Sequence, residues 1–347
     1  MSSGIATFPG PYNVSVPDHE ATGNLVISYS RNEKDFPLNK YAKLIPVSKV
    51  QGLYLKITNE EAGRLMQDGE TDWPAGAPRP SGLGTTESHA YFDYRINRKA
   101  FTVPLDDITV AEATWDIMQT HVRIKAQAAM TRRTKQAVTA LTTSGNYDSS
   151  HVSTIAAICG SGETWAGSTG TTLNIKKSID YAMNKIEQDS LSAVKLEDMV
   201  LVLNPSLAAA MSITGELRDY LKSSVYSGQV VKGDWAGPSS RGLPTQLYGV
   251  NVVVENTSQT TSRRGATAAK SYLMGNAVAA LVARPGSLQG FEGPQFSTLS
   301  MFVHKEMDML VEKIPNVRDK LTEVSIVDGT DSQITAPVTG FLFTSCQ

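Results

Sequence analysis

One segment of this 347-residue chain constrains its fold more than any other: the residues from Thr109 to Gly145 predict a single, unusually long helix. Thr109 and Glu112 have the spacing of a capping box, in which two side chains satisfy free backbone N–H groups where a helix begins. About 34 helical residues would span about 50 Å. Apolar side chains recur at helical intervals, at Trp115, Met118, Val122, Ala126, Ala129, Met130, Ala137 and Leu141.

The segment before this helix, residues 49–104, predicts an extended β-hairpin loop. Residues 53–57 and 90–96 alternate between apolar and polar side chains, as strands do. Between them, residues 72–84 are rich in proline and glycine, which oppose regular structure, so they predict a projecting tip. A strand of about 15 residues reaches about 50 Å. We therefore expect a second surface to cover part of the hairpin.

Residues 1–48 predict an extended N-terminal arm. Five prolines interrupt this segment, and its apolar patches follow no sustained period. Such an arm needs another surface to lie on; the alternative is a disordered terminus.

The second half of the chain has an α/β pattern. Met199–Leu203 is apolar throughout, as in a buried strand, and Asn204–Pro205 supplies an N-cap and a first-turn proline for the next helix. Further β segments are predicted at 250–254, 272–274 and 297–314, and the ending is predicted to alternate short strands and turns. The predicted apolar helix positions are Ile175, Ile179, Met183 and Ile186, then Leu207, Met211, Leu217 and Leu221.

Bulk composition predicts a folded protein with more than one lobe. Hydrophobic residues make up 41% and charged residues 19% of the chain, an ordinary globular balance, and the length exceeds what one hydrophobic core usually serves. The net charge of −2 provides no long-range attraction for nucleic acid or for anionic membranes. Two cysteines, Cys159 and Cys346, provide no disulfide framework, which suits a reducing compartment. We expect neither a secretory signal nor a membrane span, and therefore a cytosolic origin.

The motifs that would carry catalysis are incomplete. Residues 162–169 have the glycine spacing of a phosphate loop but lack its lysine, and Trp165 stands where a dinucleotide fingerprint needs glycine. No HExxH or GxSxG motif occurs, and for His121 a buried structural role is favoured over catalysis. On a single strand, His304, Glu306 and Asp308 would share one face and could hold a metal, but a half-exposed polar face is favoured. We expect no catalytic, cofactor or metal site.

The predicted long helix also carries a cluster of basic residues. Such side chains could contact the phosphates of DNA without reading its sequence, but a solvated helix face is favoured because the whole chain is slightly acidic. The residues are Arg123, Lys125, Arg132, Arg133 and Lys135.

The order of these parts resembles the major capsid proteins of tailed double-stranded DNA phages, of the Hong Kong ninety-seven type. The long helix from Thr109, the segments Met199–Leu207 and Leu247–Glu255, and the run Leu273–Ala283 carry the resemblance. It implies an α+β phage major capsid fold with an N-terminal arm, an extended β-hairpin loop, a peripheral domain with a long spine helix, and an axial α/β domain. Those domains would be 1–48 for the arm, 49–104 for the hairpin, 105–195 with 290–320 for the peripheral domain, and 196–289 with 321–347 for the axial domain.

The resemblance further implies a structural role. Subunits would self-assemble through pentamers and hexamers into an icosahedral shell that encloses phage DNA, in a virion assembled in the host cytoplasm. Scaffolding, portal and decoration proteins, and non-specific contact with packaged DNA, are the expected partners besides the chain itself; no membrane is expected. An encapsulin-like compartment uses the same shell fold, and a cytosolic enzyme with an unrecognised site is a further alternative.

We expect the hairpin to make contacts between subunits, because aromatic and arginine side chains often dominate protein interfaces. Near the tip, Trp73 could equally pack on its own hairpin. The candidate contact residues are Trp73, Pro74, Pro78 and Arg79 near the tip, with Arg95 and Arg98 on the return strand.

Overall fold

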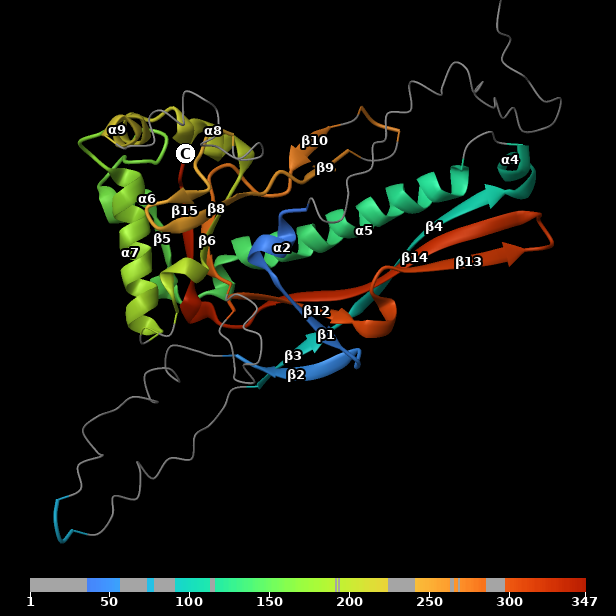
Figure 1. Cartoon of the computed structure of the whole chain (residues 1–347), viewed down its shortest axis with the longest axis horizontal. Helices are drawn as coiled ribbons and strands as arrows, with labels where there is room; N and C mark the ends of the chain where they lie inside the picture. The colour runs from blue at the N-terminus through green and yellow to red at the C-terminus, as the bar shows by residue number, and fades with distance from the viewer. Residues whose placement is uncertain are drawn as a thin grey trace, which may run out of the picture.

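The structure, a computed structural model, describes residues 36–56, 74–77, 91–112, 116–190, 192, 194–223, 241–262, 265–267, 269–284 and 297–347. Within these ranges the chain forms a six-stranded sheet and a five-stranded sheet, together with two two-stranded ribbons. In Figure 1 the six-stranded sheet lies near the C-terminal end of the long helix α5 (Ile117–Thr142), and the five-stranded sheet runs alongside the helix. Among the described helices, none combines the length and hydropathy that crossing a membrane requires.

The six-stranded sheet is mixed and has the order β5-β15-β11-β6-β8-β7. The pairs β5–β15 and β6–β8 are parallel, and the other three pairs are antiparallel. Its strands are β5 (Val152–Thr154), β6 (Met199–Leu203), β7 (Gln246–Leu247), β8 (Val250–Val254), β11 (Ala279–Ala283) and β15 (Gly340–Thr344).

Both faces of this sheet are buried, which explains why its central strands are apolar throughout. In β6, Leu201 packs with one hydrophobic cluster, while Val200 and Val202 face another. The first cluster includes residues of α6 (Ile155–Cys159), α7 (Asn174–Asp189), α8 (Pro205–Ser212) and α9 (Gly215–Ser223). The second includes residues of α2 (Leu38–Tyr41) and the C-terminal part of α5.

The five-stranded sheet is organised around one long strand, β14 (Leu321–Ile334). Strand β4 (Asn97–Asp106) pairs along β14, as do β12 (Leu299–His304) and β13 (Leu310–Asn316), all antiparallel. Strand β1 (Lys43–Val47) adds to β12 in parallel. Figure 1 shows α5 running along this sheet, with α4 (Asp107–Glu112) near the far end of β4.

The smaller elements complete the chain. One ribbon pairs β2 (Gln51–Leu55) with β3 (Tyr91–Arg95), and the other pairs β9 (Ser258–Thr260) with β10 (Lys270–Tyr272). Single 3-10 turns occur at Ser144–Asn146, Ser149–His151, Leu196–Asp198, Lys305–Met307 and Pro337–Thr339.

Several predicted elements are confirmed. Helix α7 and strands β6 and β8 lie where the sequence placed them. Asn204 caps α8 by accepting a hydrogen bond from the backbone N–H of Ser206, with Pro205 in the first turn. The paired strands β2 and β3 form the base of the predicted hairpin, whereas most of its tip lies outside the described residues.

The predicted single long helix is wrong in detail, because two helices occupy this segment. Asp106, rather than Thr109, provides the cap at the start of α4: its carboxylate accepts hydrogen bonds from the N–H and Oγ1 of Thr109. Helix α5 has its own cap, since Asp116 Oδ1 accepts a hydrogen bond from the N–H of Gln119 at 2.8 Å. Residues 113–115 between them, including Trp115, lie outside the described part.

Other boundaries also differ from the prediction. The helix predicted across Leu207–Leu221 is α8 and α9, which Ile213 and Thr214 separate. The run 297–314 is interrupted by a 3-10 turn, the strand predicted at 272–274 ends at Tyr272, and the ending contains the 14-residue β14 rather than short strands alone.

The sheets also group residues differently from the expected domains. Residues 321–334, expected in the axial domain, pair with β4, β12 and β13. Residues 152–189, expected with the spine helix, contribute β5 and α7 to the other lobe. The last part of the expected arm forms α2 and β1, and its Leu38 and Tyr41 are buried.

Candidate functional site: the open face of the long sheet

The long sheet has one face against α5 and one open face. The face against α5 carries Asp328 and Thr330, whose side chains bond to Arg133 and Gln136 of that helix. Side chains alternate along a strand, so the neighbouring odd-numbered residues of β14, such as Ser325 and Val327, lie on the other face. We call this second surface the open face.

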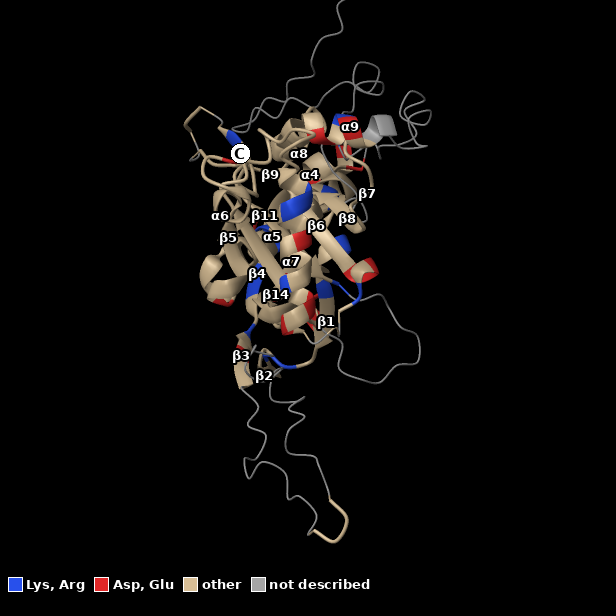
Figure 2. Cartoon of the chain, turned by 90° about the vertical axis from the view of Figure 1, so that its left-hand side faces the viewer, with Lys and Arg blue, Asp and Glu red and all other residues tan. Residues whose placement is uncertain are grey.

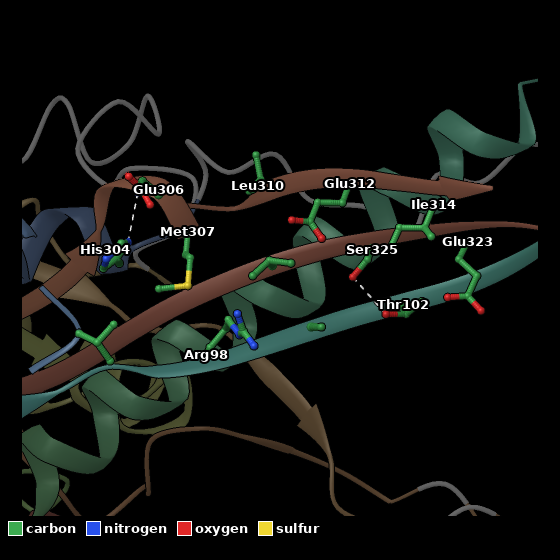
Figure 3. A pocket seen from close by; sticks show the side chains of 13 residues that line it. Arg98, Thr102, His304, Glu306, Met307, Leu310, Glu312, Ile314, Glu323 and Ser325 are labelled. Carbon is green, nitrogen blue, oxygen red and sulfur yellow. Dashed lines mark hydrogen bonds between the residues drawn. The ribbon is translucent and has the colours of Figure 1, made fainter. Parts of the chain in front are cut away.

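The strand register sets the composition of the open face. Leu310, Val327 and Ala100 stand side by side across β13, β14 and β4, as do Glu312, Ser325 and Thr102. Figure 3 labels the residues of the second row, in which Thr102 donates a hydrogen bond to Ser325 at 3.1 Å between hydroxyl oxygens. Rows of apolar side chains therefore alternate with rows of polar side chains along the open face.

A groove with a volume of about 800 Å³ runs over the open face. Leu310 and Ile314 line it and remain 45% and 50% exposed, although both belong to a regular strand. Exposed apolar side chains that gather on one regular surface commonly mark a contact site. The charged residues of the groove are Arg98, Glu306, Glu312 and Glu323.

The base of the hairpin is fixed beside this face by aromatic packing. Tyr94 stacks on Phe302 of β12 with ring centroids 4.5 Å apart, and Tyr54 lies 5.4 Å from the same ring. Gly52 leaves the space that the Tyr94 ring occupies: a Cβ added there would lie 2.6 Å from the Tyr94 hydroxyl. Burial, followed by the charges of Asp331 and Asp93, raises the pKa of Tyr54, so its hydroxyl stays neutral.

The other surface of the β2–β3 ribbon is solvent-exposed and partly apolar. Leu53 and Tyr91 are 68% and 62% exposed. The register places Leu53 opposite Asp93, and Leu55 opposite Tyr91. The hairpin therefore leaves the body of the protein with an uncovered apolar surface at its base.

The predicted contact residues fall into two groups. Trp73, Pro78 and Arg79 lie outside the described residues, and Pro74 is exposed in a short turn. Arg95 and Arg98 are both exposed: the backbone N–H of Arg95 donates to Asp331 at 3.0 Å, whereas Arg98 lines the groove. Of the three that the structure describes, only Arg98 lines the groove on the open face, and contact with another subunit stays a prediction.

The histidines and acidic residues considered for a metal site are not arranged as one. Strand β12 ends at His304, and Glu306 lies in the following 3-10 turn, so the alternation predicted through Asp308 is wrong. Across the described ranges, no group of three or more potential ligands could hold a metal ion. His121 is half-buried rather than buried. Among the described residues, His151 is fully buried, and its ring nitrogens lie 2.8 Å from Gly340 O and 2.7 Å from Asp189 Oδ2.

Sequence reasoning missed the groove residues of β13. Leu310, Glu312 and Ile314 alternate as a half-exposed strand would. The prediction treats residues 297–314 as one continuous β segment, which hides this alternation. Only the pairing with β14 shows that the apolar positions face outward.

Comparison with known proteins identifies the fold. No protein-family profile matches the chain, and no curated protein is significantly similar in sequence. Among solved structures, a phage-related protein from Bordetella bronchiseptica matches with a TM-score of 0.62 and 13% identity, covering 91% of this chain and 94% of that one. The capsid protein of cyanophage P-SCSP1u matches with a TM-score of 0.50 and 12% identity over 91% and 88% of the two chains.

An encapsulin from Synechococcus elongatus, named SrpI, matches with a TM-score of 0.51 and 9% identity over 96% of both chains. The matches therefore include both phage capsid and encapsulin shells and extend over nearly the whole length. The chain has the Hong Kong ninety-seven type fold that these shell proteins share, as the order of its parts predicted.

Proposed function

We propose that this protein is the major capsid protein of a tailed double-stranded DNA phage. The observation that carries the proposal is the match over more than nine-tenths of the chain to the phage-related and cyanophage proteins. The subunits would assemble through pentamers and hexamers into an icosahedral shell around the DNA. The role is structural, and no catalytic step is assigned to any residue.

The open face and the hairpin are the surfaces through which subunits would meet. In this proposal the hairpin of one subunit lies over the open face of a neighbour, where Leu310 and Ile314 offer apolar area. Glu306, Glu312 and Glu323 give the groove an acidic rim, which suits the arginine predicted near the hairpin tip, Arg79. Many such contacts, each weak, stabilise a closed lattice while single contacts stay reversible.

The remaining partners follow from this role. Scaffolding, portal and decoration proteins would bind the shell, packaged DNA would contact it without sequence preference, and assembly would take place in the host cytoplasm. An encapsulin-like compartment is the second candidate, because the SrpI encapsulin covers 96% of this chain. The two differ in content, since a phage shell holds DNA and a portal whereas a compartment holds a cargo enzyme.

Negative-stain electron microscopy of the purified full-length protein, together with its sedimentation profile, tests the proposal. Closed shells, rings or sheets of hexamers support it. A monodisperse monomer or dimer at all protein and salt concentrations would contradict it and return attention to an enzyme. If shells form, their contents in the native host separate phage DNA from a dedicated cargo enzyme.

A further inference from the structure

The chain passes from one sheet to the other beside a fully buried histidine. It leaves the five-stranded sheet at the end of β14, runs through the 3-10 turn Pro337–Thr339 and enters the six-stranded sheet at Gly340, the first residue of β15. His151 is completely buried against this crossing, with its Nδ1 atom 2.8 Å from the carbonyl oxygen of Gly340. One side of the imidazole ring is therefore fixed to the start of β15.

The other side of the ring contacts α7, which lies at the end of the molecule that faces the viewer in Figure 2. Nε2 of His151 is 2.7 Å from Oδ2 of Asp189, the last residue of α7. Lys185 Nζ lies 3.1 Å from the same oxygen. Burial raises the pKa of Asp189, but hydrogen bonds from His151 and Lys185 outweigh this effect and keep the pKa below its ordinary value. Asp189 is therefore a carboxylate, and His151 joins the end of α7 to the start of β15.

These two partners determine the protonation of the ring. The Gly340 carbonyl and the Asp189 carboxylate can only accept hydrogen bonds, so each ring nitrogen must carry a proton to donate. A neutral imidazole has a single N–H, and its other nitrogen would place a lone pair 2.7 Å from a carboxylate oxygen, where the two repel. The ring that satisfies both contacts is the imidazolium cation, whose buried charge Asp189 balances.

A second crossing between the sheets is fixed at the same place. The Oγ1 atom of Thr298, which precedes β12, donates a hydrogen bond to the carbonyl oxygen of Thr339 at 2.9 Å. The N–H of Thr298 donates to the last residue of β11 at 3.1 Å. A Cβ added to Gly340 would collide with Thr298 and with the ring of Tyr147, so the backbone is closely packed here. Two connections between the sheets therefore meet beside His151.

We infer that the proton of His151 controls how firmly the two sheets are joined, so that the junction is tight when the ring is charged and loosens when it is neutral. The inference concerns the single subunit and does not depend on shell formation. Carboxylic acids ordinarily titrate near about pH 4, and lysine and tyrosine near about pH 10, so histidine is the side chain whose charge changes between pH 6 and 8. The other titratable groups on the elements packed around the ring are Tyr147 and Asp148, which precede it, and Tyr181, Lys185 and Asp189 of α7.

Solid-state nitrogen-15 NMR of the sedimented full-length protein, labelled at histidine, tests the protonation whether or not the protein assembles. The signals lost in His151→Gln identify this residue. At a pH about one unit above the ordinary titration of histidine, near 6.5, both of its nitrogens should still give protonated signals. Asp189→Asn supplies an amide that can donate, so Nε2 should shift to the range of an unprotonated nitrogen. Lys185→Gln is the matched control: it removes the other partner of Asp189, and both nitrogens should stay protonated.

Unfolding should depend on the same proton. An unfolded histidine loses its proton near about pH 6.5, whereas the folded ring keeps it, so the stabilisation is complete below that pH and is lost as the pH rises. Relative to Asp189→Asn at the same pH, the unfolding equilibrium constant of the wild type should rise by up to about tenfold per pH unit between 6.5 and 8. Urea unfolding measures this ratio. Amide hydrogen exchange, corrected for its intrinsic pH dependence, should accelerate in residues 335–343 more than in β13, at the far end of the other sheet in Figure 1.

Three results would overturn the inference. The first is a wild-type ring with one unprotonated nitrogen at that pH, or a ring that stays doubly protonated in Asp189→Asn. The second is an unfolding constant whose ratio to that of Asp189→Asn does not change with pH. The third is exchange that accelerates equally in β13 and β15, which would show that the proton acts on global stability and not on the junction.

Discussion

The carboxylate of Asp328 accepts two hydrogen bonds from the guanidinium of Arg133, at 3.0 Å from Nε and 2.6 Å from Nη2. Both side chains are buried, and they join α5 to β14. Arg133 Nη2 also donates to Asp308 at 2.6 Å, in the turn before β13. A single arginine therefore holds the long helix against β14 and against the turn that precedes β13.

Removing the buried acid should be costly. Asp328→Ala leaves the Arg133 charge buried with only Asp308 as a partner, so we expect the free energy of unfolding to fall by about 3–5 kcal/mol. Asp308 is 57% exposed on its side chain, and solvent screens its pairing, so Asp308→Ala should cost less than about 1 kcal/mol. Urea denaturation of the unassembled protein measures both values. Similar losses in the two variants would contradict the central role of Asp328.

The buried carboxylate of Glu216 caps helix α7, although Glu216 belongs to another helix. Glu216 in α9 accepts hydrogen bonds from the backbone N–H groups of Ile175 and Lys176 at 3.0 and 2.9 Å, and also from Ser168 and Tyr248. The residue before α7, Leu173, provides no side-chain cap and has a φ of 51°. Glu216 therefore satisfies the N–H groups that a local cap would otherwise serve.

Replacing this carboxylate should destabilise the lobe that contains α7. Glu216→Gln removes the negative charge and turns one acceptor into a donor, so we expect a loss of about 2–4 kcal/mol from hydrogen bonds that involve a charged group. Glu187→Gln, on the exposed side of α7, is the control and should change stability by less than about 0.5 kcal/mol. Thermal or urea unfolding distinguishes them, and an unaffected Glu216→Gln variant would rule out the remote cap.

Local sequence signals predicted some elements well and others poorly. Strand β6 and its junction with α8 were predictable from local signals. Burial on both faces requires apolar residues throughout the strand, and the cap requires a residue such as Asn204 followed by Pro205. The break at Asp116 was not predictable, because an acidic residue early in a helix is also favoured by the helix dipole. The length of β14 escaped prediction because Ser325, Asp328 and Thr330 interrupt its apolar pattern. Their partners, which explain why these polar side chains are buried, lie in other segments: Thr102, Arg133 and Gln136.

The open face should matter for assembly and not for folding. Leu310→Thr with Ile314→Thr keeps strand-forming residues but removes apolar area that is already half exposed in the subunit. Burial at a contact is worth about 1–2 kcal/mol for each side chain, so the protein concentration needed for assembly should rise at least about tenfold. Light scattering measures that concentration, and circular dichroism checks the fold.

Ile124→Thr is the matched control for that pair. Ile124 is an exposed apolar residue on α5, which packs on the opposite face of the long sheet. Its replacement should leave the assembly concentration unchanged within a factor of about two, as expected for a surface substitution. An equal effect of Ile124→Thr would show that general surface hydrophobicity, and not the open face, drives association.

Alkaline pH should destabilise the protein through a buried thiol. Burial raises the pKa of Cys346 to about 12, although a backbone hydrogen bond opposes the rise. The folded thiol stays neutral where the unfolded one ionises, so this stabilisation is complete below about pH 8.5 and is lost as the pH rises toward 12. Between pH 9 and 10 the free energy of unfolding should fall by up to about 1.4 kcal/mol per pH unit from this group.

Cys346→Ala isolates this contribution. The variant loses some stability at every pH because the buried site is underpacked, but its dependence on pH between 9 and 10 should be shallower than that of the wild type. Urea unfolding at a series of pH values gives the two slopes. Identical slopes would show that Cys346 does not titrate with unfolding.

The most direct test of the account is a cryo-electron microscopy map of particles assembled from the full-length protein. We predict closed shells in which the hairpin of one subunit covers Leu310 and Ile314 of its neighbour. Shells in which the open face remains solvent-exposed would contradict the proposed contact, and protein that forms no ordered assembly would contradict the shell function itself.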